Sequence, residues 1–323
     1  MKKETYAERL HLIFFFLFLF FFPLGKPEKE NEEDYEKEKI AAAPPFNLRE
    51  VAVCAMQFSP MKQLTPLSDT QAQRDERRIP IDRVGVRALR YPMQIREKAR
   101  EVQHTIATTT LTVDLPHQFK GTHMSRFVEV LTEFGPELHV DNIHTILREL
   151  TKRLHSVSAH VDFEFPFFLT KQAPVTRAPG MMDYTARFSA TLEKGVIDFV
   201  VTVIVPVTTL CPCSKAISAQ GAHNQRGQVT YSVRFSEPIW IEDLIRVVEE
   251  SASSELYSLL KRPDEKAVTE RAYSNPVFVE DLVRNIAARS NAVPEITWYR
   301  VEAENYESIH NHNAYALIEH HKD

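Results

Sequence analysis

Apolar and polar residues alternate along many segments of the chain, which is the pattern of half-buried β-strands. Glu193-Lys194-Gly195 predicts a tight turn that joins two of these strands. The chain is therefore predicted to be rich in antiparallel sheet. The predicted strands are Val84–Ile95, Val102–Leu115, Val161–Phe165, Tyr184–Leu192, Val196–Val205, Gln228–Phe235, Ile296–Ala303 and Asn313–Glu319.

Four other segments repeat apolar residues at helical spacing. One pair is Met124–Phe134 and a helix that Asp141 caps and that runs to Leu154. The other pair is a long helix, Ile241–Lys261, and a shorter one, Val277–Ser290. In chain order the elements read strand-strand-helix-helix-strand-strand twice, in residues 68–195 and again in residues 196–323. The two halves share no evident sequence identity, so only the pattern repeats. The predicted fold class is α+β, with antiparallel sheets and a helix pair on one face of each.

The first 67 residues do not fit this pattern. Leu12–Phe22 is an unbroken apolar run, shorter than the roughly 20 residues that span a bilayer. A charged run, Lys26–Lys39, follows it and is typical of disorder. The segment fits either membrane targeting or an upstream extension that the folded part does not need. We expect residues 1–67 to be an extension and linker.

Composition excludes several classes of function. The 39 basic and 44 acidic residues nearly balance, so we expect no nucleic-acid partner. Three cysteines are too few for a disulfide framework, which favours a reducing compartment, and we expect a cytoplasmic protein. Glycine is scarce, at 8 residues, and the chain contains neither a dinucleotide-binding nor a P-loop motif.

The stretch with the clearest chemistry runs from Val205 to Gly227. It holds Cys211 and Cys213, separated by one proline, and His223 twelve residues after the first cysteine. Thiolate and imidazole suit a borderline-soft divalent metal ion. The spacing does not match a closed structural zinc site, and two structural cysteines beside a surface histidine are an equally good reading of the spacing alone. Both cysteines follow a predicted strand, where functional loops often begin.

The sequence motifs around these residues, P-V-T-T-L-C-P-C-S-K-A-I-S and G-A-H-N-Q-R-G, resemble the signature of GTP cyclohydrolase type IB. The resemblance extends from about Asp69 to the end of the chain. It implies the tunnelling fold, built here from two modules in tandem, and a homotetramer with its sites at subunit interfaces. It also implies a hydrolase that converts GTP and water to 7,8-dihydroneopterin triphosphate and formate, the first step of tetrahydrofolate biosynthesis.

The resemblance also assigns residues to a metal site. It implies that Cys211, His223, Glu265 and His310 bind a divalent ion, which is zinc, manganese or iron, and that Cys211 is catalytic as well. By themselves, Glu265 reads as a solvated acid in a polar break between two helices, and His310 reads as a surface residue near a turn. We refer to these four residues as the predicted ligand set.

Substrate contacts follow from the same resemblance. Glu280 matches the purine-anchoring glutamate of the family, although helix capping is its ordinary explanation. Lys120, His123 and Arg126 match a family segment that could contact the triphosphate, although a basic helix entry explains them equally well.

The later steps of this reaction need proton shuttling, for which Cys213, His312 and His123 are candidates that the sequence does not rank. Two other functions stay open. One is the archaeal relative that forms a cyclic phosphate from GTP, and the other is a non-catalytic metal or redox sensor that uses the two cysteines.

Overall fold

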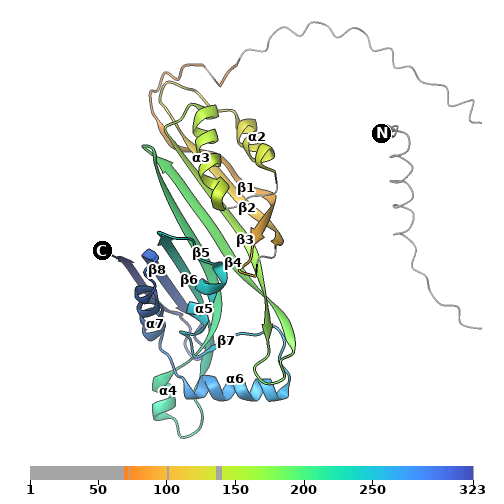
Figure 1. The fold of residues 1–323 in the computed structure, drawn as a ribbon. Coiled ribbons are helices and arrows are strands. Elements are labelled where there is room, and N and C mark those ends of the chain that lie inside the picture. Colours follow the sequence, from red (N-terminus) through yellow and green to blue (C-terminus); the bar gives the residue numbers. More distant parts are fainter. Residues whose placement is uncertain (1–68, 72, 100–101, 136–139, 323) are drawn as a thin grey trace, which may run out of the picture. The chain divides into compact units, whose positions relative to one another are not determined.

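The computed structural model describes residues 69–71, 73–99, 102–135 and 140–322 (Figure 1). The expected extension and linker, residues 1–67, lie outside these ranges. Within them, no helix is long and apolar enough to cross a membrane.

Every predicted strand is present, and most of them extend further than the alternation indicates. The strands are β1 (Ile81–Arg96), β2 (Val102–Leu115), β3 (Ser158–Gln172), β4 (Pro179–Glu193), β5 (Val196–Leu210), β6 (Asn224–Phe235), β7 (Ser254–Glu255), β8 (Ile296–Asn305) and β9 (Ala314–His321). The helices are α2 (Met124–Phe134), α3 (Val140–Leu154), α4 (Pro212–Ile217), α5 (Ile241–Glu249), α6 (Arg262–Ser274) and α7 (Val279–Ala292).

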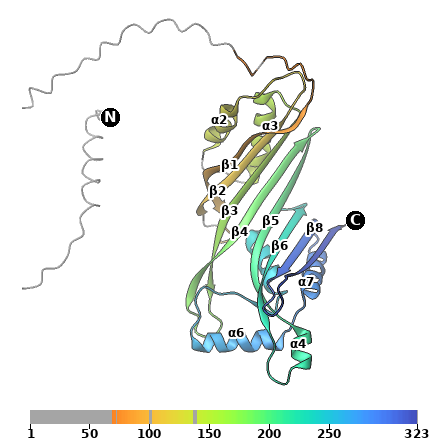
Figure 2. The same ribbon diagram turned by 180° about the vertical axis from the view of Figure 1, so that it is seen from behind.

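The strands of the described chain form one antiparallel sheet in the order β1-β2-β3-β4-β5-β6-β8-β9, with β7 paired to β5 (Figures 1 and 2). The predicted turn at Lys194 and Gly195 joins β4 to β5, and these two strands pair directly. The two predicted modules therefore share a continuous sheet. The α+β class with antiparallel sheet is confirmed.

Alternate residues of each strand face a core that the helices cover. Phe163, Phe165 and Phe167 of β3 are fully buried, because every second side chain of a strand points to the same face. Helix α3 contacts α2, β3 and β4, while α7 contacts α5, β8 and β9. Each half of the sheet thus has its own helix pair, as the sequence pattern predicts.

Three predictions about helices are wrong. The long helix Ile241–Lys261 ends at Glu249, because serines that follow bond the backbone in other ways. Ser251 Oγ donates to the Val247 carbonyl at 2.6 Å, and Ser253 Oγ accepts the Leu210 N–H at 3.0 Å. The expected polar break after that helix is in fact a further helix, α6, with a proline in its first turn. Helix α3 begins at Val140, so Asp141 lies in its first turn and not at its N-cap.

Candidate functional site

The β5–β6 hairpin brings the two most specific predicted ligands together. Leu210, the last residue of β5, pairs with Asn224, the first residue of β6. Directly beyond this pair, the Cys211 N–H donates to the His223 carbonyl at 3.1 Å. Both side chains are half-buried. Their proximity is therefore a local result of the hairpin.

Helix α4 fixes the cysteine. Cys211 is its N-cap, and the thiol sulfur accepts the Ser214 N–H at 3.3 Å. The hydroxyl of Ser214 in turn accepts the His223 N–H at 3.1 Å. Cys213 lies on α4 with an exposed side chain, and neither cysteine is in a disulfide. One serine thus contacts both predicted ligands.

The loop after β8 reaches the same place. Tyr306 N–H donates to the Arg226 carbonyl at 2.8 Å, and Gln225 Nε2 donates to Glu307 Oε1 at 3.3 Å. Ser308 Oγ then lies 3.2 Å from His223 Nδ1. Two residues further on is the exposed His310.

The rings of His310 and His312 stack with their centroids 5.2 Å apart. His310, a third predicted ligand, thus lies in a loop that contacts His223 through Ser308.

Next to this loop, four side-chain oxygen atoms are buried and find no hydrogen-bond partner in the described part of the chain. Thr209 Oγ1, Gln225 Oε1, Asn305 Oδ1 and Glu307 Oε2 are buried, and they have no hydrogen-bond partner among the described residues. Thr209 pairs with Gln225, and Asn305 pairs with Gly227, so the first three share the core face of β5, β6 and β8. Buried polar atoms are normally bonded. These oxygen atoms are therefore exceptions to that rule at this end of the core.

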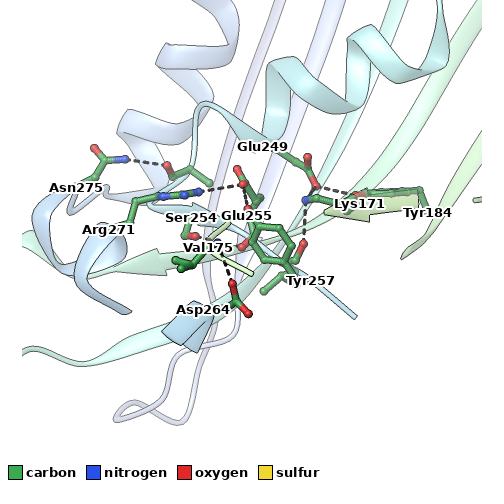
Figure 3. Close-up of polar contacts among 12 residues, drawn as sticks. Lys171, Val175, Tyr184, Glu249, Ser254, Glu255, Tyr257, Asp264, Arg271 and Asn275 are labelled. Atoms are coloured by element: carbon green, nitrogen blue, oxygen red, sulfur yellow. Dashed lines mark hydrogen bonds and ion pairs between the residues drawn. The ribbon is translucent and has the colours of Figure 1, made fainter. Parts of the chain in front are cut away.

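Glu265 has an exposed side chain in the first turn of α6. Its neighbour Asp264 is fully buried and fastens this turn to the β3–β4 loop (Figure 3). The Asp264 carboxylate accepts the N–H groups of Val175 and Thr176 at 2.9 Å each, the Thr176 hydroxyl at 2.7 Å and the Lys261 N–H at 3.0 Å. Burial favours the neutral acid, but these hydrogen bonds outweigh it and hold the pKa of Asp264 below its ordinary value.

The other end of α6 lies against α4. Lys215 Nζ donates to the Tyr273 carbonyl at 2.5 Å and lies 4.5 Å from the centroid of its ring. Glu265 precedes Tyr273 by eight residues, which is about 12 Å along a helix axis. In the described ranges, no three His, Cys, Asp or Glu side chains are close enough to hold a metal ion. The predicted ligand set stays a prediction, with Cys211, His223 and His310 on neighbouring segments and Glu265 on α6.

Glu280 is the second residue of α7 and its side chain is exposed. The carboxylate that bonds the first turn is that of Asp281, which accepts the Phe278 N–H at 3.3 Å. Capping therefore does not account for Glu280. The entry to α7 is tied to the site, because Val277 N–H donates to the Leu210 carbonyl at 3.0 Å, directly before Cys211.

The three basic candidates lie at the other end of the sheet. Lys120 Nζ is 3.4 Å from Gln73 Oε1, His123 Nε2 is 3.1 Å from Asp69 Oδ2, and Arg126 donates to the Arg153 carbonyl at 2.8 Å. Lys120 and His123 lie in the loop after β2 and Arg126 in the first turn of α2, and the last residues of β2 lie level with the β4–β5 turn. Cys211 follows the opposite end of β5, about 45 Å away for a strand of this length.

A partly buried ion pair supports the segment between α5 and α6 (Figure 3). Lys171 Nζ of β3 donates to Glu249 Oε1 at 2.7 Å and to the Leu256 carbonyl at 2.8 Å. The Tyr184 hydroxyl donates to the same Glu249 oxygen at 2.7 Å. Burial, and then the negative charge of Glu249, raises the pKa of Tyr184. These contacts join the first predicted module to the segment that leads into α6.

Sequence reasoning missed the roles of Asp264, Ser214 and Ser308. For Asp264 a signal exists, because Arg262-Pro263-Asp264-Glu265 has the proline and acids of a helix start. Ser214 lies inside the first of the two sequence motifs, but only the structure shows its contacts with Cys211 and His223. No local signal marks Ser308, whose partner lies 85 residues earlier.

The fold and site together define an α+β protein with a cysteine and a histidine side by side at one end of its sheet. Residues 67–316 match the family model described as type I GTP cyclohydrolase FolE2. The chain is 62% identical over 256 residues to GTP cyclohydrolase FolE2 of Akkermansia muciniphila, covering 78% of this chain and 97% of that protein. It is 55% identical over 251 residues to the Syntrophus aciditrophicus protein of the same name, covering 78% and 98%.

Among solved structures, uricase from Arthrobacter globiformis aligns with a TM-score of 0.42 at 10% identity, over 74% of this chain and 92% of that one. The family model and the close relatives agree. The chain belongs to the type I GTP cyclohydrolase FolE2 family.

Proposed function

We propose that this chain is a type IB GTP cyclohydrolase that converts GTP and water to 7,8-dihydroneopterin triphosphate and formate. The observation that carries the proposal is the hydrogen bond from Val277 to Leu210, which links the start of the helix that carries Glu280 to the residue before Cys211. A carboxylate that could anchor a purine and a pair that could bind a metal thus belong to one end of the sheet. Family membership supports the substrate.

The donor set suits a zinc, manganese or iron ion. Cys211 offers a sulfur that already accepts an N–H, and His223 has Nδ1 next to Ser308 and Nε2 without a partner among the described residues. Glu265 and His310 would complete the set once α6 and the loop after β8 approach the pair. A divalent ion held there supplies a nucleophilic water at neutral pH.

The reaction balances with one net water. Two waters release C8 of the purine as formate, and closure of the new ring returns one. Cys213, His312 and His123 remain the candidates for moving protons. The exposed positions of Cys213 and His312 beside the pair favour them within one chain.

The triphosphate contacts require a second copy of the chain. Lys120, His123 and Arg126 lie at the opposite end of β5 from Cys211, so one GTP molecule cannot span both sets within one chain. We therefore place the active site at an interface, in a homotetramer in which Lys120 of one copy lies near Cys211 of another. The free cysteines favour a reducing, cytoplasmic setting.

The test uses purified protein, GTP and Mn²⁺, and it detects formate and a fluorescent pterin after oxidation. Chelator-treated protein should be inactive and should recover with Mn²⁺ or Zn²⁺. A cyclic phosphate product would support the archaeal activity. Absence of any product would support the metal or redox sensor.

Glu280→Gln tests the purine anchor. A carboxylate can accept the N1–H and the amine of guanine together, while the amide of glutamine presents a donor to them. Losing such a hydrogen-bonded contact costs specificity by about 10⁴-fold in well-built sites, so we expect kcat/KM for GTP to fall by at least about 10³-fold. Asp281→Asn, one residue further along α7, is the matched control and should keep the parental kcat/KM. Parental turnover by Glu280→Gln would place the purine elsewhere.

A further inference from the structure

Ser308 contacts the ring of His223 from a distant part of the chain. Its hydroxyl lies 3.2 Å from His223 Nδ1, within hydrogen-bond distance. The main chain of His223 is held separately, by the Cys211 N–H on its carbonyl and by Ser214 Oγ on its N–H. With the backbone fixed on both sides, the ring orientation depends on what its nitrogens meet.

The position of Ser308 is itself fixed by two contacts with β6. Tyr306 N–H extends the pairing of β8 with β6 by bonding the Arg226 carbonyl. Glu307 then accepts from Gln225, whose side chain is buried. These two bonds immediately precede Ser308. The hydroxyl is therefore presented to the histidine by a short, doubly anchored segment.

We infer that Ser308 is a positioning residue that selects the metal-binding nitrogen of His223. An imidazole that donates its Nδ1–H to a hydroxyl has its lone pair on Nε2, and histidines that bind metals use such a partner on the other nitrogen. With Ser308 as the acceptor of this hydrogen bond, Nε2 is the nitrogen offered to the ion. The inference rests on the proposed function, because it assigns a role at the same metal site.

The test measures the Zn²⁺ dissociation constant of the full chain by competition with a chromophoric chelator. Loss of an outer partner of a ligating histidine weakens metal binding 10–100-fold, so Ser308→Ala should raise the constant about tenfold or more. Ser308→Thr keeps a hydroxyl and should restore the affinity to within about twofold of the parent. Ser218→Ala is the matched control. Among the described residues its hydroxyl bonds only the nearby Gln220 backbone, and neither predicted ligand is among its partners.

A spectroscopic readout separates positioning from general damage. In the Co²⁺-substituted protein, Ser308→Ala should alter the ligand-field bands that report the nitrogen ligand, while the thiolate charge-transfer band of Cys211 persists. A Zn²⁺ constant for Ser308→Ala within about twofold of the parent overturns the positioning role. If His223→Ala also binds Zn²⁺ as tightly as the parent, the proposed metal site fails as well, and the two failures are thereby distinguished.

Discussion

Removing the positive charge of Lys171 should destabilise the protein, because the largely buried Glu249 carboxylate would lose its positively charged partner. The Lys171 and Glu249 side chains are 15% and 12% exposed, and their charged atoms are 2.7 Å apart. Lys171→Met keeps the apolar stem and removes the ammonium. Glu249 would then retain only the Tyr184 hydroxyl among its described donors. The Leu256 carbonyl would lose its Lys171 donor as well.

The size of the effect follows from this burial. Breaking a buried ion pair by removing one partner costs about 3–5 kcal/mol. Because both side chains keep some exposure, we expect the lower end, about 3 kcal/mol. At about 2 °C per kcal/mol for a large domain, the melting temperature should fall by about 6 °C.

Two further variants make the assay, thermal unfolding at fixed protein concentration, decisive. Lys98→Met removes the same ammonium from an exposed pair, in which Lys98 Nζ lies 2.7 Å from Asp243 Oδ1, and it should cost no more than about 1 kcal/mol. The double variant Lys171→Met with Glu249→Gln removes both charges and should recover at least half of the loss. The reasoning fails if Lys171→Met is no worse than Lys98→Met. It also fails if the double variant unfolds as early as the single one.

Three other predictions concern assembly, α6 and alkaline pH. Mixed oligomers of Lys120→Ala and Cys211→Ala chains should regain about a quarter of parental activity if each site combines two copies, and inactive mixtures would contradict the interface. Asp264→Asn should lower the melting temperature more than Asp281→Asn, because Asp264 is buried and accepts four hydrogen bonds where Asp281 accepts one; equal losses would contradict this. Burial, and then the bond to Glu255, raises the pKa of Tyr257 to about 12, so its contribution to stability is complete below about pH 10 and is lost as the pH approaches 12. Absorbance titration of a Tyr257→Phe variant should show one tyrosine fewer ionising in that late step, which Tyr231 shares because burial also raises its pKa to about 12, and an unchanged curve would contradict the assignment.

Much of the fold is predictable from the sequence because its strands are half-buried. A strand with one covered face must alternate, and β2 and β4 do so along most of their length. The segment after Glu249 is different. Its apolar residues at Leu256, Leu259 and Leu260 continue a helical spacing, yet intervening serines bond β5 and the preceding turn. Tertiary contacts override the local pattern there, and periodicity alone does not reveal them.

In the candidate site, too, contacts between neighbouring segments are predictable from the sequence and contacts between distant segments are not. Cys211 and His223 end adjacent strands of one hairpin, so the sequence places them together as soon as β5 and β6 are recognised. Ser308 and Asp264 contact residues 85 and 88 positions away. Those contacts depend on the order of strands in the sheet and on the path of α6, which spacing within a segment does not encode.

The anchoring of α6 explains why Glu265 stands apart from the other predicted ligands. Its N-terminal turn is fixed to the β3–β4 loop through Asp264, while its C-terminal end contacts α4 through Lys215. Cys211 is the N-cap of α4, so the cysteine is connected to the turn that carries Glu265 through α4 and then along the length of α6. Bringing the acid to the Cys211–His223 pair therefore requires α6 or α4 to shift as a unit, or a second copy to supply the acid. Mixed oligomers of Glu265→Ala and Cys211→Ala chains distinguish these cases, because intact metal sites, about a quarter of the total, should reappear only if a second copy supplies the acid.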